Sequence, residues 1–165
     1  MIVYLVGMPG SGKSTVGREL AGRYGVPFVD LDVEIEQDAG TSVPEIFADH
    51  GEAAFRALEA QALLKASAHD PSVVACGGGI VLEPANRITL RNTGICVFLD
   101  VPLERLRARI EPSTDRPLIR SEGDLERLFV ARQPLYREFA AHVVEASGDP
   151  SEVADAIVEE LRWSA

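Results

Sequence analysis

The sequence predicts an α/β fold in which a five-stranded parallel sheet is covered by helices on both faces. One observation is that five short apolar runs alternate along the chain with longer stretches of helical spacing. Another is that the first run is hydrophobic at every position, which is typical of a parallel strand buried on both faces. Ligands of such sheets bind at the carboxyl ends of the strands, so we expect the functional residues there.

The chain opens with a strand, a helix and a second strand. Ile2–Val6 is a continuous apolar run that ends at a glycine. Ser14–Tyr24 has helical spacing and is followed by Gly25, which suits the left-handed position that ends a helix. The second strand, Val26–Leu31, is short and ends in acidic residues.

A long helical region and the third strand follow. Val43–His69 is helical with a break near Gly51, and its second part places apolar residues along one face. Val73–Cys76 is a buried strand that runs into three glycines. The next helix extends from Pro84 to about residue 91.

The fourth strand is Ile95–Leu99, and Pro102 then opens a helix with an apolar face. Residues 111–123 are polar, contain proline and lack hydrophobic periodicity, so we expect a mobile loop there.

The remaining elements are a helix over Leu125–Phe139, a fifth strand over His142–Ala146 and a final helix. Asp149 can cap this last helix, and Pro150 occupies its first turn.

Composition limits the classes of function. The 165 residues fit one domain, spanning 1–165, and the net charge of −10 argues against a nucleic-acid or anionic-membrane binder. No apolar run approaches the roughly 18 residues of a membrane span, and residues 1–4 lack the basic segment of a signal peptide. Cys76 and Cys96 are expected to be buried thiols rather than a disulfide framework. We expect a cytoplasmic protein, and a monomer.

Residues 7–14, Gly-Met-Pro-Gly-Ser-Gly-Lys-Ser, match the phosphate-loop pattern G-x-x-x-x-G-K-[ST] between a strand and a helix. In such a loop consecutive backbone N–H groups wrap an anion, and the following helix adds its positive end. Lys13 can reach the β- and γ-phosphates, and the Ser14 hydroxyl can ligate Mg²⁺. The predicted nucleotide-binding residues are Gly10, Ser11, Gly12, Lys13, Ser14 and Thr15. Because no Asn-Lys-x-Asp tetrapeptide occurs, a small phosphotransferase is favoured over a regulatory GTPase.

Asp30 and Asp32 lie two residues apart at the end of the second strand, a spacing that aims both carboxylates to one side. One of them can hold a Mg²⁺-bound water while the other accepts a hydrogen bond from a substrate hydroxyl. Alternatively, one of them caps the helix that follows.

Five further segments follow the phosphate loop and the aspartate pair along the chain. They are Gly40-Thr41-Ser42-Val43-Pro44-Glu45-Ile46-Phe47, Gly51-Glu52 with Phe55-Arg56 and Glu59, Gly77-Gly78-Gly79, Arg116-Pro117-Leu118, and Arg132-Gln133-Pro134-Leu135-Tyr136. In order and approximate spacing, the motifs together resemble the shikimate kinase family over nearly the whole chain.

The resemblance implies a three-layer P-loop fold of the nucleoside-monophosphate-kinase type, with a mobile lid at about 111–123 and a substrate-binding region at about 32–60. It implies an ATP-dependent kinase that phosphorylates the 3-hydroxyl of shikimate in chorismate and aromatic amino-acid biosynthesis, with Mg²⁺ held by Ser14 and Asp30. The implied shikimate-binding residues are Asp32, Arg56, Gly77, Gly78, Gly79 and Arg132. Arg116 would close over the phosphates, Arg109 would lie near the adenine, and the catalytic residues would be Lys13, Asp32 and Arg116.

The residue types suit these roles, although each has an ordinary structural alternative. Arg56 and Arg132 can form forked hydrogen bonds to a carboxylate, but without the resemblance the favoured role of either arginine is a surface ion-pair partner. Three glycines after a buried strand let a ligand approach the backbone, or they form a loose turn. The chain departs from the family at residues 147–150, Ser-Gly-Asp-Pro, where relatives often carry a basic residue near the adenine.

Three other functions remain open at the level of sequence. They are a kinase for another hydroxylated acid or cyclitol, a nucleoside monophosphate kinase, and a nucleotide-binding module without turnover.

Overall fold

Five parallel strands form the centre of the protein in a computed structural model that describes residues 1–110 and 116–163. The strands are β1 (Ile2–Val6), β2 (Phe28–Asp30), β3 (Ser72–Ala75), β4 (Gly94–Asp100) and β5 (His142–Glu145). They lie in the order β2-β3-β1-β4-β5, and every neighbouring pair is parallel. The predicted parallel sheet is confirmed.

The central strand β1 is buried at all five of its residues, as its continuous apolar sequence predicts. Leu5 is in register with Ala75 of β3 on one side and with Val97 of β4 on the other. The chain segments that follow β1 and β3 therefore leave the sheet at the same edge, which is where the site is built.

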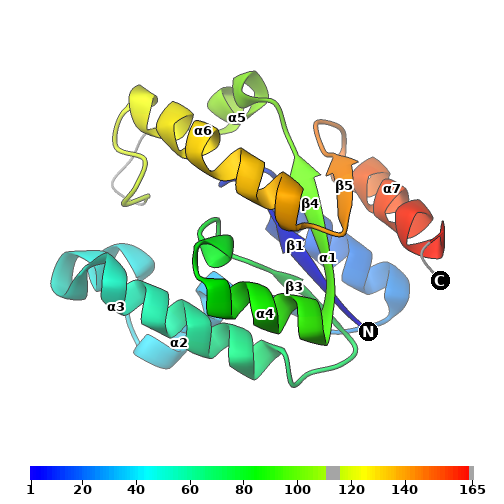
Figure 1. Cartoon of the computed structure of the whole chain (residues 1–165), viewed down its shortest axis with the longest axis horizontal. Helices are drawn as coiled ribbons and strands as arrows, with labels where there is room; N and C mark the ends of the chain where they lie inside the picture. The colour runs from blue at the N-terminus through cyan, green and yellow to red at the C-terminus, as the bar shows by residue number, and fades with distance from the viewer. Residues whose placement is uncertain (111–115, 164–165) are drawn as a thin grey trace.

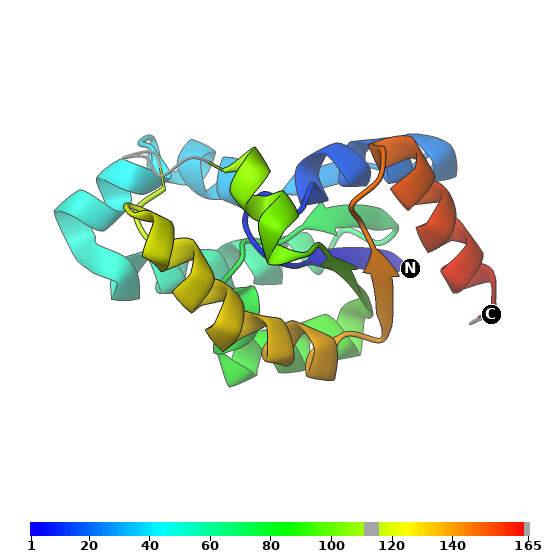
Figure 2. The same cartoon turned by 90° about the horizontal axis from the view of Figure 1, so that it is seen from above.

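Helices cover both faces of the sheet and complete the three predicted layers. Figures 1 and 2 show α1 and α7 together on one face and α4 and α6 on the other, with α2 and α3 at one end. Their bounds are α1 (Lys13–Tyr24), α2 (Leu31–Ala39), α3 (Val43–Ala66), the 3-10 turn η1 (Ile80–Leu82), α4 (Pro84–Thr93), α5 (Leu103–Arg109), α6 (Glu122–Phe139) and α7 (Pro150–Trp163). None of the helices in the two described stretches is long and apolar enough to cross a membrane.

Helix α2 was not predicted, and the second strand is shorter than predicted. The expected strand extends to Leu31, but the structure ends β2 at Asp30 and begins α2 at Leu31. The reason is a cap: the Asp30 carboxylate accepts hydrogen bonds from the backbone N–H groups of Asp32 and Val33. The alternative that one aspartate caps the next helix is therefore correct for Asp30.

Several smaller expectations are also tested. Gly51 interrupts α3 with a φ of 84°, which confirms the predicted break. Cys76 and Cys96 are both buried and unpaired, as expected, although Cys76 lies just beyond β3. Of the predicted loop 111–123, residues 111–115 lie outside the described part, and α6 already begins at residue 122.

Candidate active site

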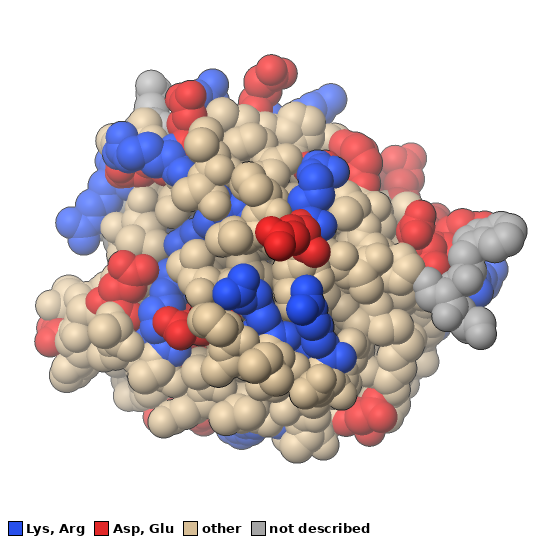
Figure 3. Space-filling view, viewed as in Figure 1, with Lys and Arg blue, Asp and Glu red and all other residues tan. Residues whose placement is uncertain are grey.

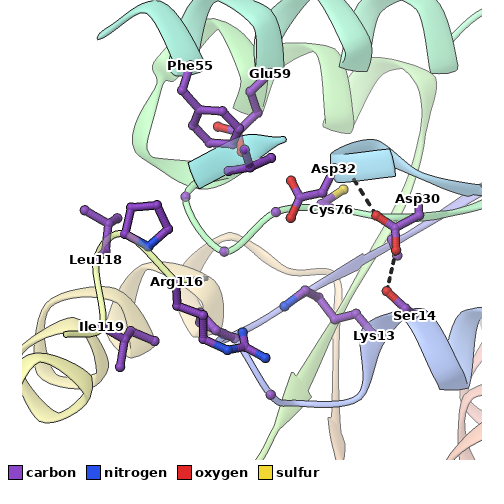
Figure 4. A pocket seen from close by; sticks show the side chains of 18 of the residues that line it. Lys13, Ser14, Asp30, Asp32, Phe55, Glu59, Cys76, Arg116, Leu118 and Ile119 are labelled. Atoms are coloured by element: carbon purple, nitrogen blue, oxygen red, sulfur yellow. Dashed lines mark hydrogen bonds between the residues drawn. The ribbon is translucent and has the colours of Figure 1, made fainter. Parts of the chain in front are cut away.

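A cleft of about 550 Å³ lies at the carboxyl ends of the strands (Figure 4). Its lining comes from the phosphate loop, the start of α2, helix α3, the glycine triplet after β3, residues 116–119 and helix α6. Most of the predicted site residues are brought together here, namely Gly10, Gly12, Lys13, Ser14, Thr15, Asp30, Asp32, Arg56, Gly77, Gly78, Gly79, Arg116 and Arg132. Ser11 and Arg109 are the two that do not line it.

The phosphate loop takes its shape from glycines that no other residue replaces easily. Gly10 and Gly12 have φ values of 79° and 91°, in the left-handed region. A Cβ atom on Gly10 would also lie 2.5 Å from Cδ1 of Ile110. Ser11 is buried beneath the loop, at 1% exposure, where its hydroxyl has no partner in the described part of the chain.

The Lys13 amine lies folded over this loop. Its Nζ donates hydrogen bonds to the carbonyl oxygens of Gly7 (2.8 Å) and Met8 (2.9 Å). Burial lowers the pKa of Lys13 to about 8, although the nearby Asp32 carboxylate opposes that shift. The amine is therefore held at the loop but is less firmly protonated than an exposed lysine.

Ser14 and Asp30 lie side by side at the start of α1 and the end of β2. The Ser14 hydroxyl donates a hydrogen bond to one carboxylate oxygen of Asp30, while the other oxygen caps α2. Both are hard oxygen ligands of the kind that Mg²⁺ prefers, and Mg²⁺ commonly takes its other ligands from water and nucleotide phosphates. The described residues contain no group of three or more His, Cys, Asp or Glu side chains that could hold a metal. The pair therefore fits a Mg²⁺ ion that arrives with a nucleotide.

The Asp32 carboxylate has an oxygen that accepts no hydrogen bond from the described residues. That oxygen is also buried. Burial raises the pKa of Asp32, and the neighbouring Asp30 carboxylate raises it further. Figure 4 shows Asp32 and Lys13 pointing into the same space, so a ligand hydroxyl there would meet an unsatisfied carboxylate.

Two arginines and a buried glutamate lie on the far side of this space. Arg56 donates to Glu59 (3.0 Å) and Glu52 (3.1 Å), and Glu59 is only 1% exposed. Burial raises the pKa of Glu59, with Arg56 acting in the opposite direction. Arg132 is 5% exposed and forms no salt bridge within the described ranges, although the Glu59 carboxylate and the Tyr136 hydroxyl lie near it. A buried cation that no carboxylate contacts directly is costly, so Arg132 is suited to an anionic ligand.

The glycine triplet is packed directly against these charged groups. A Cβ atom on Gly77 would lie 2.6 Å from an oxygen of Glu59, and one on Gly79 would lie 2.1 Å from Nη1 of Arg56. A Cβ atom on Gly78 would lie 3.2 Å from Nη1 of Arg132. The triplet is therefore no loose turn, because at each position a charged side chain occupies the place of a Cβ or lies close against it.

Arg109 lies outside the cleft, on the other side of the phosphate loop. Its guanidinium donates to the carbonyl oxygens of Gly10 (3.2 Å) and Ser147 (3.2 Å). It therefore joins the phosphate loop to the segment that follows β5. Arg116 is in the cleft, on the described end of the predicted lid (Figure 4).

Sequence reasoning did not assign several residues that line the cleft or support it. Glu59 lies three residues after Arg56 on the same helix, a spacing that signals a pair. Phe47 and Phe55 flank the break in α3, with ring centroids 4.9 Å apart. Pro117, Leu118 and Ile119 make an apolar wall. Pro117 and Leu118 belong to the Arg-Pro-Leu motif of the expected lid, but their role as a wall of the cleft depends on how the segment packs.

Acidic and basic side chains are interspersed over the face seen in Figure 3, which fits a chain with net charge −10. The cleft lining brings together four basic side chains, Lys13, Arg56, Arg116 and Arg132, and four acidic ones, Asp30, Asp32, Glu36 and Glu59. The lining is therefore balanced in charge, and its basic groups are available to anionic ligands in a chain whose net charge is −10.

Comparison with known proteins agrees with this geometry. A family model described as shikimate kinase matches residues 9–162. A shikimate kinase of Halorhodospira halophila is 46% identical over 164 residues, covering 97% of this chain and 93% of that protein. One of Aromatoleum aromaticum is 47% identical over 154 residues, covering 91% and 88%. The solved structure of shikimate kinase from Acinetobacter baumannii in complex with shikimate superposes with a TM-score of 0.95 at 36% identity, covering 99% of this chain and 93% of that one. The chain belongs to the shikimate kinase family.

Proposed function

We propose that this cleft transfers the γ-phosphoryl group of ATP to the 3-hydroxyl of shikimate, giving shikimate 3-phosphate and ADP. This reaction is a step in the biosynthesis of chorismate and the aromatic amino acids. The observation that carries the proposal is that one cleft combines a phosphate loop, a buried Arg132 without a salt bridge in the described residues, and a half-buried Asp32 with one unsatisfied carboxylate oxygen. Shikimate offers a carboxylate to Arg132 and ring hydroxyls to Asp32.

Phosphoryl transfer leaves little covalent work to the protein, so positioning and charge neutralisation dominate. Arg132 and Arg56 bind the shikimate carboxylate, with the N–H groups of the glycine triplet beside them. Asp32 accepts the hydrogen bond of the 3-hydroxyl and aims its oxygen at the γ-phosphorus. Its raised pKa makes it a better proton acceptor than an ordinary carboxylate.

On the nucleotide side, Lys13 leaves the carbonyls of Gly7 and Met8 and moves to the β- and γ-phosphates. Arg116 approaches the same charge from the opposite wall. Ser14 and Asp30 hold Mg²⁺, which, when bound, neutralises charge on the phosphate oxygens. Arg109 lies where the base would extend beyond the phosphate loop.

We also propose that the protein acts as a cytoplasmic monomer with one domain over residues 1–165. A monomer is compatible with the site because the predicted cleft-lining residues among the described ones lie on a single chain.

The test is coupled ADP release with MgATP over a panel of acceptors. We expect shikimate to stimulate ADP release far more than gluconate, cyclitols or nucleoside monophosphates. Strong stimulation by another hydroxylated acid or cyclitol would favour that kinase instead. If the protein binds ATP but no acceptor stimulates ADP release, the remaining interpretation is a non-catalytic nucleotide-binding module.

A further inference from the structure

The buried tyrosine of α6 lies beneath the glycine triplet. Tyr136 is 0% exposed, and its hydroxyl donates a hydrogen bond to the carbonyl oxygen of Gly78 while it also contacts the side chain of Arg132, one helical turn earlier on α6. Its ring packs on Phe98 of β4, with centroids 5.3 Å apart, which fixes the direction of the hydroxyl. Tyr136 does not line the cleft, whereas Gly78 and Gly79 do. The Tyr136 hydroxyl therefore contacts the glycine triplet, residues 77–79, on the side away from the proposed ligand.

The hydrogen bond from Tyr136 to Gly78 also determines where the backbone N–H of Gly79 points. The peptide bond between Gly78 and Gly79 is trans, so its carbonyl and its N–H point in opposite directions. Because the Gly78 carbonyl points down to Tyr136, the Gly79 N–H points away from it, toward the cleft side. Nothing in the described part of the chain accepts a hydrogen bond from that N–H. It is a free donor, as an anion-binding wall requires.

Three consecutive glycines would not hold this orientation by themselves. Glycine adopts a wide range of backbone conformations at little cost, so a peptide between two glycines rotates easily. Rotation would turn the Gly78 carbonyl into the cleft in place of the N–H. A Gly78 carbonyl that pointed into the cleft would repel the carboxylate of a ligand, and the cleft would lose one hydrogen-bond donor.

We infer that Tyr136 is a positioning residue for shikimate, because its hydroxyl locks the Gly78–Gly79 peptide with the N–H toward the cleft. The inference rests on the proposed function, since it assumes that shikimate occupies the space beside the triplet. Burial raises the pKa of Tyr136 to about 12, so the hydroxyl keeps its proton and remains a donor throughout the physiological range.

The chain offers a matched control. Tyr4 is also 0% exposed, and its hydroxyl is hydrogen-bonded to Thr93 at 2.7 Å, away from the cleft. Tyr136→Phe and Tyr4→Phe therefore each remove one hydroxyl and its part-buried hydrogen bond, to Gly78 and Thr93 respectively, and Tyr136→Phe also removes the contact of the hydroxyl with Arg132. Only the first should change how shikimate binds.

The experiment measures the Kd of shikimate by calorimetry and the KM of both substrates for the wild type and the two variants. We expect Tyr136→Phe to weaken shikimate binding about tenfold, which corresponds to about 1.4 kcal/mol, and to leave the KM for ATP within about twofold. Tyr4→Phe should leave both constants unchanged. Amide hydrogen exchange should become faster at residues 77–82 in Tyr136→Phe alone.

An unchanged shikimate Kd in Tyr136→Phe overturns the inference, even if hydrogen exchange at the triplet speeds up. Equal losses for shikimate and ATP, or an equal loss of shikimate affinity in Tyr4→Phe, overturn it as well, since they indicate general destabilisation. If the wild type itself does not bind shikimate, the proposed function is wrong. That outcome differs from one in which the wild type binds shikimate and Tyr136→Phe binds it equally well, which contradicts only the role of Tyr136.

Discussion

In the phosphate loop, the amine of Lys13 contacts two backbone carbonyl oxygens and has a pKa of about 8. Nucleotide phosphates would favour its charged form and raise that pKa again. By linkage, nucleotide affinity is then constant below pH 8 and falls as the pH rises above it, because the unliganded amine has lost its proton there. The decline approaches about tenfold per pH unit.

Calorimetry with MgADP between pH 6.5 and 9.5 measures this decline. In Lys13→Met binding should be weaker and nearly independent of pH, and turnover should fall by at least about 100-fold. A flat profile in the wild type would show that Lys13 does not titrate on binding.

A substitution of Arg132 tests the side of the cleft that is proposed to bind shikimate. Removing a buried cation that pairs with a ligand carboxylate costs about 2–3 kcal/mol, so Arg132→Ala should raise the KM for shikimate by roughly 30- to 150-fold. The KM for ATP should change little. Steady-state kinetics measure both constants, with Arg137→Ala as the control: Arg137 is on the same helix, half-exposed and paired with Asp100. An effect mainly on ATP would relocate the acid-binding site.

At the scale of the elements, the segment between β3 and η1 must have no side chain at Gly79. In Gly79→Ala the new methyl group would meet the guanidinium of Arg56, which must then move. We expect shikimate affinity to fall about tenfold or more while MgADP affinity stays the same, as measured by calorimetry.

Gly22→Ala is the matched control for that change. Gly22 lies inside α1 with open space around it, so alanine there should stabilise the protein by about 0.5–1 kcal/mol through helix propensity. Thermal unfolding of both variants separates the local collision from a general effect of adding a methyl group. Unchanged shikimate binding in Gly79→Ala would mean that the position of Arg56 is not critical.

Asp30 caps helix α2, which begins at Leu31, and it therefore has a structural role as well as a proposed metal-binding role. Asparagine caps helices about as well as aspartate, so Asp30→Asn should keep its melting temperature but lose most of its Mg²⁺-dependent activity. Asp30→Ala should lose both, with a cost of about 1 kcal/mol, or roughly 2–4 °C. Thermal unfolding and activity across Mg²⁺ concentrations distinguish the two roles. Full activity in Asp30→Asn would remove this carboxylate from the metal site.

At the scale of the whole molecule, the phosphate loop, α2 and α3 all connect to one continuous sheet and core. We therefore expect a single cooperative unfolding transition. Shikimate at 100 times its Kd should add about 2.7 kcal/mol to the free energy of unfolding and move that transition as a unit. Scanning calorimetry measures this shift, and two separate transitions, only one of them moved by shikimate, would indicate two domains.

The sequence predicted the sheet well because the inner strands β1, β3 and β4 carry nearly uninterrupted apolar runs, whereas the edge strands β2 and β5 are short and contain charged residues. It did not predict α2, because that nine-residue helix has only two buried residues, Leu31 and Ile35, and several acids. The two aspartates at its start suit either site chemistry or a helix cap, and the structure shows that Asp30 is the cap.

The site residues were predictable one motif at a time, but their contacts were not. The pairing of Arg56 with Glu59 is local and lies within reach of sequence reasoning. The hydrogen bond of Tyr136 to Gly78 joins residues 58 positions apart, so only the packing of α6 against the sheet reveals it.

The close packing of the glycine triplet also has a consequence for how this family can vary. Positions 77 and 79 lie against Glu59 and Arg56, whose side chains occupy the place of a Cβ, and position 78 lies close to Pro9 and Arg132. A lineage that acquired a side chain at position 79 would have to displace the arginine at 56 from its present place in the same step. We therefore expect substitutions at these paired positions to occur together across relatives, with each pair inherited as a unit.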